Sequence, residues 1–423
     1  MKKKNALLNT LVVLIAILFS LLAAELLLRV IPAEKNAEQL LDYRDSWRQG
    51  GLGPGGYLQE DFTADMQDGF GGAIRWKNNS QGFRNDKDFL VPPPANTFRI
   101  LSMGDSFTGG YRVGQDETFS FLIEQQLAEK YVDLNPEVMI SVIEDPLTGL
   151  YYLASQGASY SPDLVVLGIT LGNDIAQTYW NMGPIYRLID SEPFVEEVTD
   201  RDASKKRRAG IEAEQIPSKC LTPRGLNQNY NKSGPRWSDK SPQKRKDELR
   251  IISLLSNIRQ RFNHDAPQTV ISNWEEYDAP RLFDSNGLGI FLRSPPAEVT
   301  RAYDELFMTL SAYSKFSRSR KLEFLVVIFP QRFQVQDQDW SMTLDVYGLR
   351  EACFDRELPG RRIMDFCKAN KINCFDPAQR MKELYETGGE GLYLPRHDMH
   401  WNARGHSALA DALLPVINGI LKQ

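Results

Sequence analysis

The stretch FRILSMGDSFTGG, residues 98–110, decides the fold of this chain. It begins with a short apolar run that ends in Gly104, and residues 117–131 (ETFSFLIEQQLAEKY) then carry apolar side chains at helical spacing. The pattern predicts a buried strand, a turn that carries Ser106, and a helix. Open α/β sheets bind their ligands at the carboxyl ends of parallel strands, so this turn is a candidate for the functional site.

The same unit of strand and helix recurs along the chain. The other apolar runs are VMISVI (138–143), DLVVLGI (163–169), KLEFLVVIF (321–329) and INCFD (372–376), each next to a helical stretch. Apolar runs that alternate with helices predict a parallel sheet covered on both faces. We therefore expect a three-layer α/β/α sandwich with a central parallel sheet.

The composition excludes several classes of protein. The 423 residues are 42% hydrophobic and 25% charged, as in an ordinary folded protein with one large or two smaller domains. The formal net charge of −5 argues against a nucleic-acid partner, because such proteins present a basic surface. Four histidines, and four cysteines without a CxxC pair, predict neither a metal site nor a cofactor.

The four cysteines, Cys220, Cys353, Cys367 and Cys374, permit disulfides without requiring them. Cys367 and Cys374 lie where a helix is expected to give way to a strand, and a bridge there can close a short loop. Buried free cysteines are the alternative, since they are common small core residues.

Residues 1–30 predict a membrane anchor. Three lysines precede residues 6–24 (ALLNTLVVLIAILFSLLAA), an uncharged stretch long enough to cross a bilayer. Because lysines at this end stay in the cytoplasm, we expect a single-pass protein of the cell membrane with its main domain extracytoplasmic, periplasmic or extracellular. The alternative is a signal peptide cleaved after the small residues Ala23 and Ala24, which gives a secreted protein.

Residues 31–95 are rich in glycine, proline and polar residues, which predicts a stalk and loops packed on the main domain. The main domain, 96–423, is interrupted by an insertion at about 176–298. Its basic runs, KKRR (205–208) and QKRKDELR (243–250), predict a solvated surface; attraction to anionic glycans or phospholipid headgroups is the alternative. The amphipathic segment 251–262 is expected to dock the insertion on the domain.

Three short segments carry candidate chemistry. Ser106 can be a nucleophile, although Asp-Ser before a helix is also a plain N-cap. Asp398 and His400 stand two apart, so on an extended loop the carboxylate can reach Nδ1 while Nε2 faces Ser106. Asn173 follows a predicted strand, where its amide can donate to an oxyanion together with the main-chain N–H of Ser106, but asparagine is also a common turn former.

In this order the segments resemble the SGNH/GDSL hydrolase superfamily. The matching blocks are Gly104-Asp105-Ser106, Gly172-Asn173-Asp174, and Asp398 with His400, Asn402 and Gly405. The resemblance implies that Ser106 is the nucleophile, Asn173 an oxyanion donor, His400 the base and Asp398 its partner. Residues 79–85 (NSQGFRN) also resemble membrane-anchored members with a long insertion.

Two departures from the family pattern stand out. Many members have the aspartate three residues before the histidine, where this chain has His397. Asp398, two before, resembles the D-x-H-W variant of polysaccharide O-acetyltransferases. The second block, a glycine whose N–H completes the oxyanion hole, is poorly formed, and Gly149 is the nearby glycine that can fill the role.

The leading hypothesis is an SGNH/GDSL-type serine esterase that hydrolyses an acyl ester, an O-acylated glycan or a lipid ester, through an acyl-enzyme. The alternative is an O-acetyltransferase that passes the acyl group to a sugar of the envelope or of an exopolysaccharide. A third hypothesis, from another class, is a non-catalytic scaffold that binds glycan.

Overall fold

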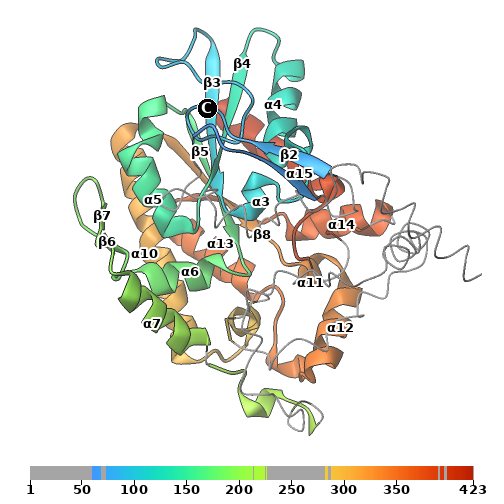
Figure 1. Cartoon of the computed structure of the whole chain (residues 1–423). Helices are drawn as coiled ribbons and strands as arrows, with labels where there is room; N and C mark the ends of the chain where they lie inside the picture. Colours follow the sequence, from blue (N-terminus) through green and yellow to red (C-terminus); the bar gives the residue numbers. More distant parts are fainter. Residues whose placement is uncertain are drawn as a thin grey trace, which may run out of the picture. The chain divides into compact units, whose positions relative to one another are not determined.

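The computed structural model describes most of the chain from residue 60 onward (Figure 1). The described residues are 60–67, 73–212, 214–223, 225, 282–283, 287–388, 391–394 and 398–422. Within these ranges, no helix is both long enough and apolar enough to cross a bilayer. The predicted anchor at 6–24 and the segments 243–250 and 251–262 lie outside the described residues.

The centre of the fold is a five-stranded parallel sheet with the order β4-β3-β5-β8-β9. Its strands are β3 (Thr97–Gly104), β4 (Asn135–Val142), β5 (Leu164–Thr170), β8 (Glu323–Phe329) and β9 (Asn373–Phe375). Each apolar run singled out in the sequence forms one of these strands, so the predicted parallel sheet is confirmed. β3 lies between β4, where Gly104 is opposite Val142, and β5, where Met103 is opposite Leu167.

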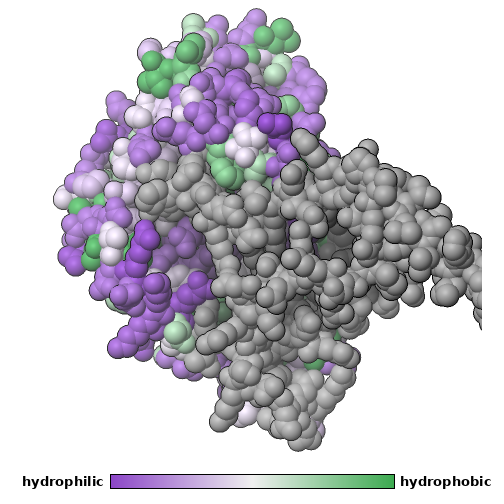
Figure 2. Space-filling view, viewed as in Figure 1, coloured by the Kyte–Doolittle hydropathy of each residue, from purple (hydrophilic) through white to green (hydrophobic). Residues whose placement is uncertain are grey.

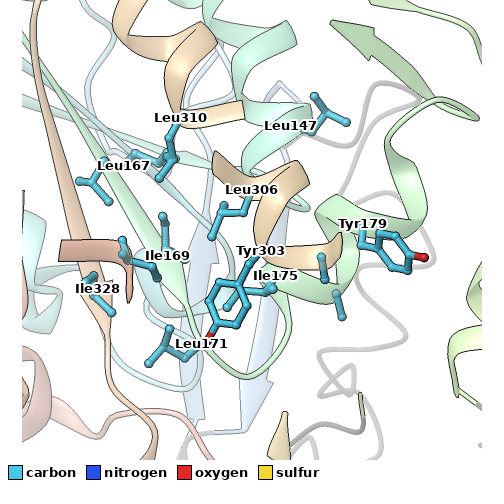
Figure 3. Packing of buried hydrophobic residues seen from close by; sticks show 14 of the residues in the cluster. Leu147, Leu167, Ile169, Leu171, Ile175, Tyr179, Tyr303, Leu306, Leu310 and Ile328 are labelled. Carbon is cyan, nitrogen blue, oxygen red and sulfur yellow. The ribbon is translucent and has the colours of Figure 1, made fainter. Parts of the chain in front are cut away.

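Helices cover both faces of this sheet. One layer holds α5 (Pro146–Ser155), α6 (Asp174–Asn181), α10 (Ala297–Arg320) and α13 (Leu358–Asn370), and the other holds α4 (Phe119–Lys130), α14 (Ala378–Gly388) and α15 (Ala403–Leu421). Neighbouring strand residues point to opposite faces: Leu101 packs in the first layer and Ile100 in the second. In Figure 3, Leu306 and Leu310 of α10 lie beside Leu167 and Ile169 of β5. The three layers are those that the alternating pattern predicted.

Side chains just before the first turn start several of these helices. Asp145 caps α5 by accepting from the main-chain N–H of Leu147 at 2.8 Å, and Pro146 occupies the first helical position. Thr118 caps α4 and Asn402 caps α15 in the same way. The starts of these helices are therefore encoded locally.

A β-hairpin packs on the sheet where the sequence predicted loops. β1 (Thr63–Gln67) pairs antiparallel with β2 (Ala73–Lys77), and Met66 and Trp76 bury their side chains against Val142 of β4. Both strands are short and carry several polar residues, so they leave little apolar pattern for sequence reasoning to find.

The described part of the insertion is folded against the domain. It contains the hairpin of β6 (Tyr186–Leu188) and β7 (Val195–Glu197), followed by α7 (Arg201–Glu212), which holds the basic run 205–208. Arg207 of that run pairs with Glu305 of α10 at 2.6 Å and lies over the ring of Tyr179. This arginine anchors α7, whereas Lys205 and Lys206 are exposed.

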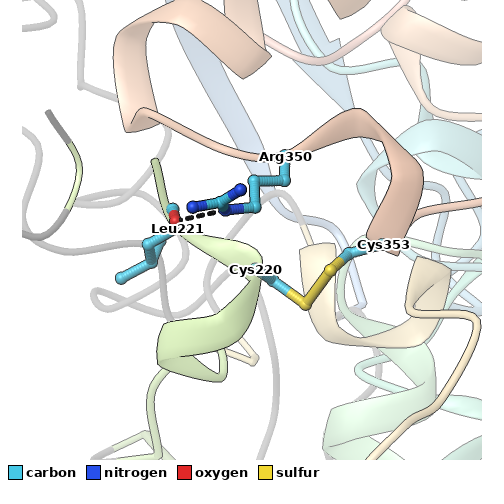
Figure 4. The surroundings of a disulfide bond; sticks show 4 residues. All are labelled: Cys220, Leu221, Arg350 and Cys353. Carbon is cyan, nitrogen blue, oxygen red and sulfur yellow. Dashed lines mark hydrogen bonds between the residues drawn. A yellow bond between two sulfur atoms is a disulfide. The ribbon is translucent and has the colours of Figure 1, made fainter. Parts of the chain in front are cut away.

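All four cysteines form disulfides. Cys220 is bonded to Cys353, 133 residues away, and the main-chain carbonyl of Leu221 beside it accepts from Arg350 at 2.7 Å (Figure 4). Cys367 near the end of α13 is bonded to Cys374 in β9, the short loop considered above. After β8 the chain continues through α11 (Arg332–Val335) and α12 (Asp337–Tyr347) to Cys353.

The described surface is mostly hydrophilic in the view of Figure 2, with hydrophobic residues in small separate groups. Single exposed apolar side chains such as Val132 and Leu90 are ordinary for a folded domain in water.

Candidate active site

Ser106 stands directly after β3, at the first position of the short helix α3 (Ser106–Gly109). The turn is tight: a Cβ atom at Gly104 would overlap the Thr108 hydroxyl and lie 3.2 Å from the carbonyl oxygen of Gly168. The glycine therefore lets β3 run close to β5 before the chain turns. Ser106 is left part-exposed at the carboxyl edge of the sheet.

Asp105, the residue before the serine, accepts several hydrogen bonds. Its buried carboxylate accepts from the main-chain N–H of Phe107 at 3.0 Å, from the Thr170 hydroxyl at 2.8 Å and from the Asn173 amide at 3.1 Å. These bonds tie the turn after β3 to the turn after β5. Sequence reasoning treated Asp105 as part of a motif and assigned it no contact.

The structure brings Asp398 and His400 to Ser106. Ser106 Oγ lies 2.7 Å from His400 Nε2, and His400 Nδ1 lies 2.6 Å from Asp398 Oδ1. Because an ionised carboxylate can only accept, Nδ1 carries the proton and Nε2 accepts from the serine hydroxyl. The two-residue spacing that departs from the common family pattern thus still delivers the carboxylate to Nδ1.

The loop that holds His400 is fixed from several sides. The main-chain N–H of His400 also donates to Asp398 Oδ1, at 3.0 Å. The main-chain carbonyl of His400 accepts from the N–H of Leu394 at 2.8 Å. The next residue, Trp401, is fully buried, with its ring 4.8 Å from that of Phe107. Phe107 in turn lies 4.8 Å from the imidazole. The imidazole is therefore positioned before any substrate binds.

Asp398 is ionised in this setting. Burial opposes its charge, but the positive charge that His400 carries when it is protonated, the two hydrogen bonds from His400 and the charge of Arg112 outweigh burial and lower the pKa of the Asp398 carboxyl below its usual value. A carboxylate that stays charged stabilises the imidazolium that forms when His400 takes a proton from Ser106.

Two donors are available for an oxyanion. The main-chain N–H of Ser106 has no acceptor among the described residues. Asn173 Nδ2 carries two hydrogens, of which one bonds Asp105, and Asn173 itself stands at the start of α6 without a side-chain capping bond. Asp105 therefore orients the amide that the sequence proposed as an oxyanion donor.

Gly149 is not part of this arrangement, and the prediction that it completes the oxyanion hole is wrong. It lies inside α5, where its N–H donates to the carbonyl of Asp145 at 2.9 Å. It is buried, and a Cβ atom there would overlap Ile143 and the Tyr313 hydroxyl. This glycine is required for packing of α5 on the core, which explains its presence without an oxyanion role.

The other histidines have different environments. His406 in α15 is buried, its Nδ1 accepts from the main-chain N–H of Phe119 at 3.3 Å, and burial lowers its pKa to about 3. Its burial and this bond give His406 a structural role. His397 lies outside the described residues.

Sequence reasoning missed two residues beside the triad, Tyr111 and Arg112. The Tyr111 ring is 4.4 Å from the imidazole of His400, and Arg112 Nε is 3.7 Å from Asp398 Oδ2. The only sequence signal was their place just after the GDSFTGG turn, and that place does not reveal contact with residues near the other end of the chain.

No family model matches the chain, and no curated protein matches it by sequence. Among solved structures it is similar to a two-domain esterase active on acetylated mannans, at 9% identity and a TM-score of 0.35, over 77% of this chain and 50% of that one. An acetyl xylan esterase is similar at 10% identity and a TM-score of 0.33, over 76% of this chain and 100% of that one. A GDSL-like lipase from Bacteroides thetaiotaomicron is similar at 10% identity and a TM-score of 0.30, over 78% and 93%. The chain thus spans about half the length of the mannan esterase.

Sequence identities of 9–10% do not transfer an activity to this chain, so the chemistry of the site is inferred from its own side chains. The parallel sheet, the serine after β3 and its contacts with His400 and Asp398 are those that the resemblance to the SGNH/GDSL superfamily implies. The chain therefore has the three-layer fold and the Ser–His–Asp contacts that this resemblance implies. Its site places a serine hydroxyl, an imidazole and a carboxylate in hydrogen-bond contact, the arrangement that acyl transfer by serine requires.

Proposed function

We propose that this chain is a serine ester hydrolase that works through an acyl-enzyme on the extracytoplasmic side of the cell membrane. One observation carries the proposal: the unbroken series of contacts from Ser106 Oγ to His400 Nε2 and from His400 Nδ1 to Asp398. Serine is a weak nucleophile until an adjacent base removes its proton, and this series supplies the base together with the group that orients it.

The reaction follows from these contacts. Ser106 Oγ attacks the ester carbonyl while His400 Nε2 takes the hydroxyl proton, and the carbonyl oxygen becomes an oxyanion beside the Ser106 N–H and the Asn173 amide. Collapse of this intermediate expels the alcohol, which receives the proton from His400, and leaves Ser106 acylated. Water, activated by His400, then releases the acid and restores the serine.

The proposed substrates are esters found outside the cytoplasm, an O-acylated glycan or a lipid ester. The location is supported by the lysines before the apolar segment 6–24 and by two disulfides, which persist in oxidising compartments and are rare in the cytosol. An alkaline phosphatase fused at Gln423 should therefore be active in cells, and activity of a cytosolic reporter alone would contradict the location.

A second candidate function shares the acyl-enzyme and differs in the acceptor. The Asp398-x-His400-Trp401 sequence resembles that of polysaccharide O-acetyltransferases, and the structure shows this spacing forming the triad contacts. In that case a sugar hydroxyl, instead of water, takes the acyl group from Ser106.

A panel of p-nitrophenyl esters of increasing acyl length, given to the full chain in detergent, tests the proposal. We expect turnover with at least one ester, and loss of that turnover in Ser106→Ala with unfolding unchanged within about 1 kcal/mol. Acyl transfer to added sugar acceptors, exceeding hydrolysis, would favour the transferase. A Ser106→Ala protein as active as wild type would remove both, and a folded wild type inert in every assay would favour the non-catalytic scaffold.

A further inference from the structure

The second oxygen of the Asp398 carboxylate faces a cation. Oδ1 is occupied by the ring and the main chain of His400, whereas Oδ2 lies 3.7 Å from Nε of Arg112. The two side chains are mostly buried, with 30% of Arg112 and 18% of Asp398 exposed. At these exposures the pair is screened less than a surface ion pair.

The loop that presents Arg112 is rigidly held. Arg84, which is fully buried, donates to the main-chain carbonyls of Gly109, of Gly110 at 2.8 Å and of Val113 at 2.7 Å. Arg112 itself has a φ of 61°, a left-handed conformation that non-glycine residues seldom adopt. Such conformations persist where the surroundings fix them, and they cluster at functional sites.

Tyr111 links the cation to the base. Its ring lies 4.4 Å from the imidazole of His400, and the guanidinium of Arg112 lies 5.0 Å from the same ring. The loop therefore contacts both partners of Ser106: Tyr111 packs on the base and Arg112 faces the carboxylate.

We propose that Arg112 is a positioning residue that acts through Asp398. It holds Oδ2 so that Oδ1 stays directed at His400 Nδ1, and it keeps the carboxylate charged when His400 becomes protonated. It does not touch the reacting atoms. The inference rests on the proposed function, because it assigns Arg112 a part in activating Ser106.

Two readouts test this without a known natural substrate. One is turnover of an uncharged p-nitrophenyl ester. The other is the rate at which an uncharged alkyl fluorophosphonate labels Ser106: Oγ forms a bond to phosphorus, the P–F bond breaks, fluoride leaves and His400 takes the serine proton. An uncharged probe has no group for Arg112 to bind, so an effect on the rate reports activation of the serine.

We expect Arg112→Ala to lower kcat and the maximal labelling rate about tenfold with KM little changed, the size expected for two coupled groups in contact. Arg112→Lys should recover part of that loss because it restores the charge. In an Asp398→Asn background the same Arg112→Ala change should cost less than about twofold, because the carboxylate through which it acts is gone.

Arg320→Ala is the matched control. Arg320 also pairs with a carboxylate, Glu192 at 3.0 Å, and lies over an aromatic ring, but it ends α10 just before β8, at the opposite edge of the sheet. This control should keep wild-type rates, and thermal unfolding should show each variant folded.

Several outcomes would overturn the inference. Unchanged rates in folded Arg112→Ala, an equal loss with and without Asp398, or a rise in KM alone would each do so. The proposed function can fail while the inference stands. If Ser106 were labelled at a rate that depends on Arg112 but no ester were turned over, the hydrolase proposal would be contradicted and the positioning role of Arg112 would remain. A wild type that neither turns over an ester nor is labelled would remove both.

Discussion

Carboxylates stand on both sides of Ser106 at the same sheet edge, and they differ in what surrounds them. On the α15 side, Asp398 has His400 and Arg112 beside it, and its pKa is lowered. On the α6 side, Asp145 and Asp174 are buried, and burial raises the pKa of both carboxyls. Neutral donors form hydrogen bonds to the buried Asp145 and Asp174, but these bonds do not offset the rise in pKa that burial causes. A nearby cation, as beside Asp398, does offset that rise.

The two buried carboxylates, Asp145 and Asp174, hold neighbouring elements together. Asp145 accepts from the start of α5 and from Asn181 Nδ2 at 2.9 Å, while Asp174 Oδ2 accepts from the main-chain N–H of Thr170 at 2.7 Å. Asp174 is further disfavoured as an anion by the charges of Asp105 and Asp145. We therefore expect changes on the α15 side to affect rate and changes on the α6 side to affect stability, with Asn173 at the boundary between them.

The largest effect is expected from His400→Ala. Loss of the base should lower ester turnover by roughly 10²- to 10⁴-fold, because Ser106 then has no group to take its proton. Asp398→Asn should keep somewhat more activity, since the imidazole remains but is less well oriented. Steady-state kinetics on the three proteins measures this, and a larger loss in His397→Ala than in His400→Ala would contradict our choice of base.

Asn173→Ala tests the boundary residue. If its amide donates to the oxyanion, kcat should fall about 10²- to 10³-fold with KM little changed and stability nearly constant. If Asn173 only shapes the turn, the melting temperature should fall while kcat of the folded protein survives, and Asn173→Gly should restore stability. A stable and fully active Asn173→Ala protein would contradict both roles.

Gly149→Ala should affect stability alone. The added methyl group overlaps Ile143 and the Tyr313 hydroxyl, so the free energy of unfolding should fall by about 1 to 3 kcal/mol, with kcat per folded molecule unchanged. Chemical denaturation and active-site titration with the fluorophosphonate measure the two quantities. A fall in kcat without a loss of stability would contradict this and would favour an oxyanion role for Gly149.

Asp174→Asn is expected to change how stability depends on pH. The pKa of Asp174 is raised from 3.8 in the folded state, so the native state keeps a proton that the unfolded state releases. Its stabilisation is full below pH 3.8 and is lost as the pH rises toward the folded pKa, by at most about 1.4 kcal/mol per pH unit.

Asp174→Asn should remove this loss, so that the stability of the variant relative to wild type increases as the pH rises above 4. Denaturant unfolding between pH 4 and 8 measures it. His406 has the opposite sign, because its pKa is lowered from 6.5 to about 3 and its contribution falls as the pH drops below 6.5. If the stabilities of Asp174→Asn and the wild type differed by the same amount at every pH from 4 to 8, the raised pKa of Asp174 would be contradicted.

Much of the fold could be predicted because its signals are local. Strand β3, the turn at Ser106 and helix α4 follow one another within a few dozen residues, and each is marked by the spacing of apolar residues or by a cap. The hairpin of β1 and β2 could not be found in the same way, because what stabilises it is the burial of Trp76 against Val142, a residue far along the chain.

The sequence by itself determined the residue types of the site, since acyl transfer by serine requires a base and a carboxylate, and Asp398 and His400 stand close enough to serve. Only the tertiary structure decided which residues meet. It brings His400 to Ser106 across 294 residues, pairs Cys220 with Cys353, places Arg112 beside Asp398, and commits the Gly149 N–H to a helix. The physical reason is that contacts between distant segments depend on how strands are ordered and how helices pack, and neither periodicity nor spacing records that order.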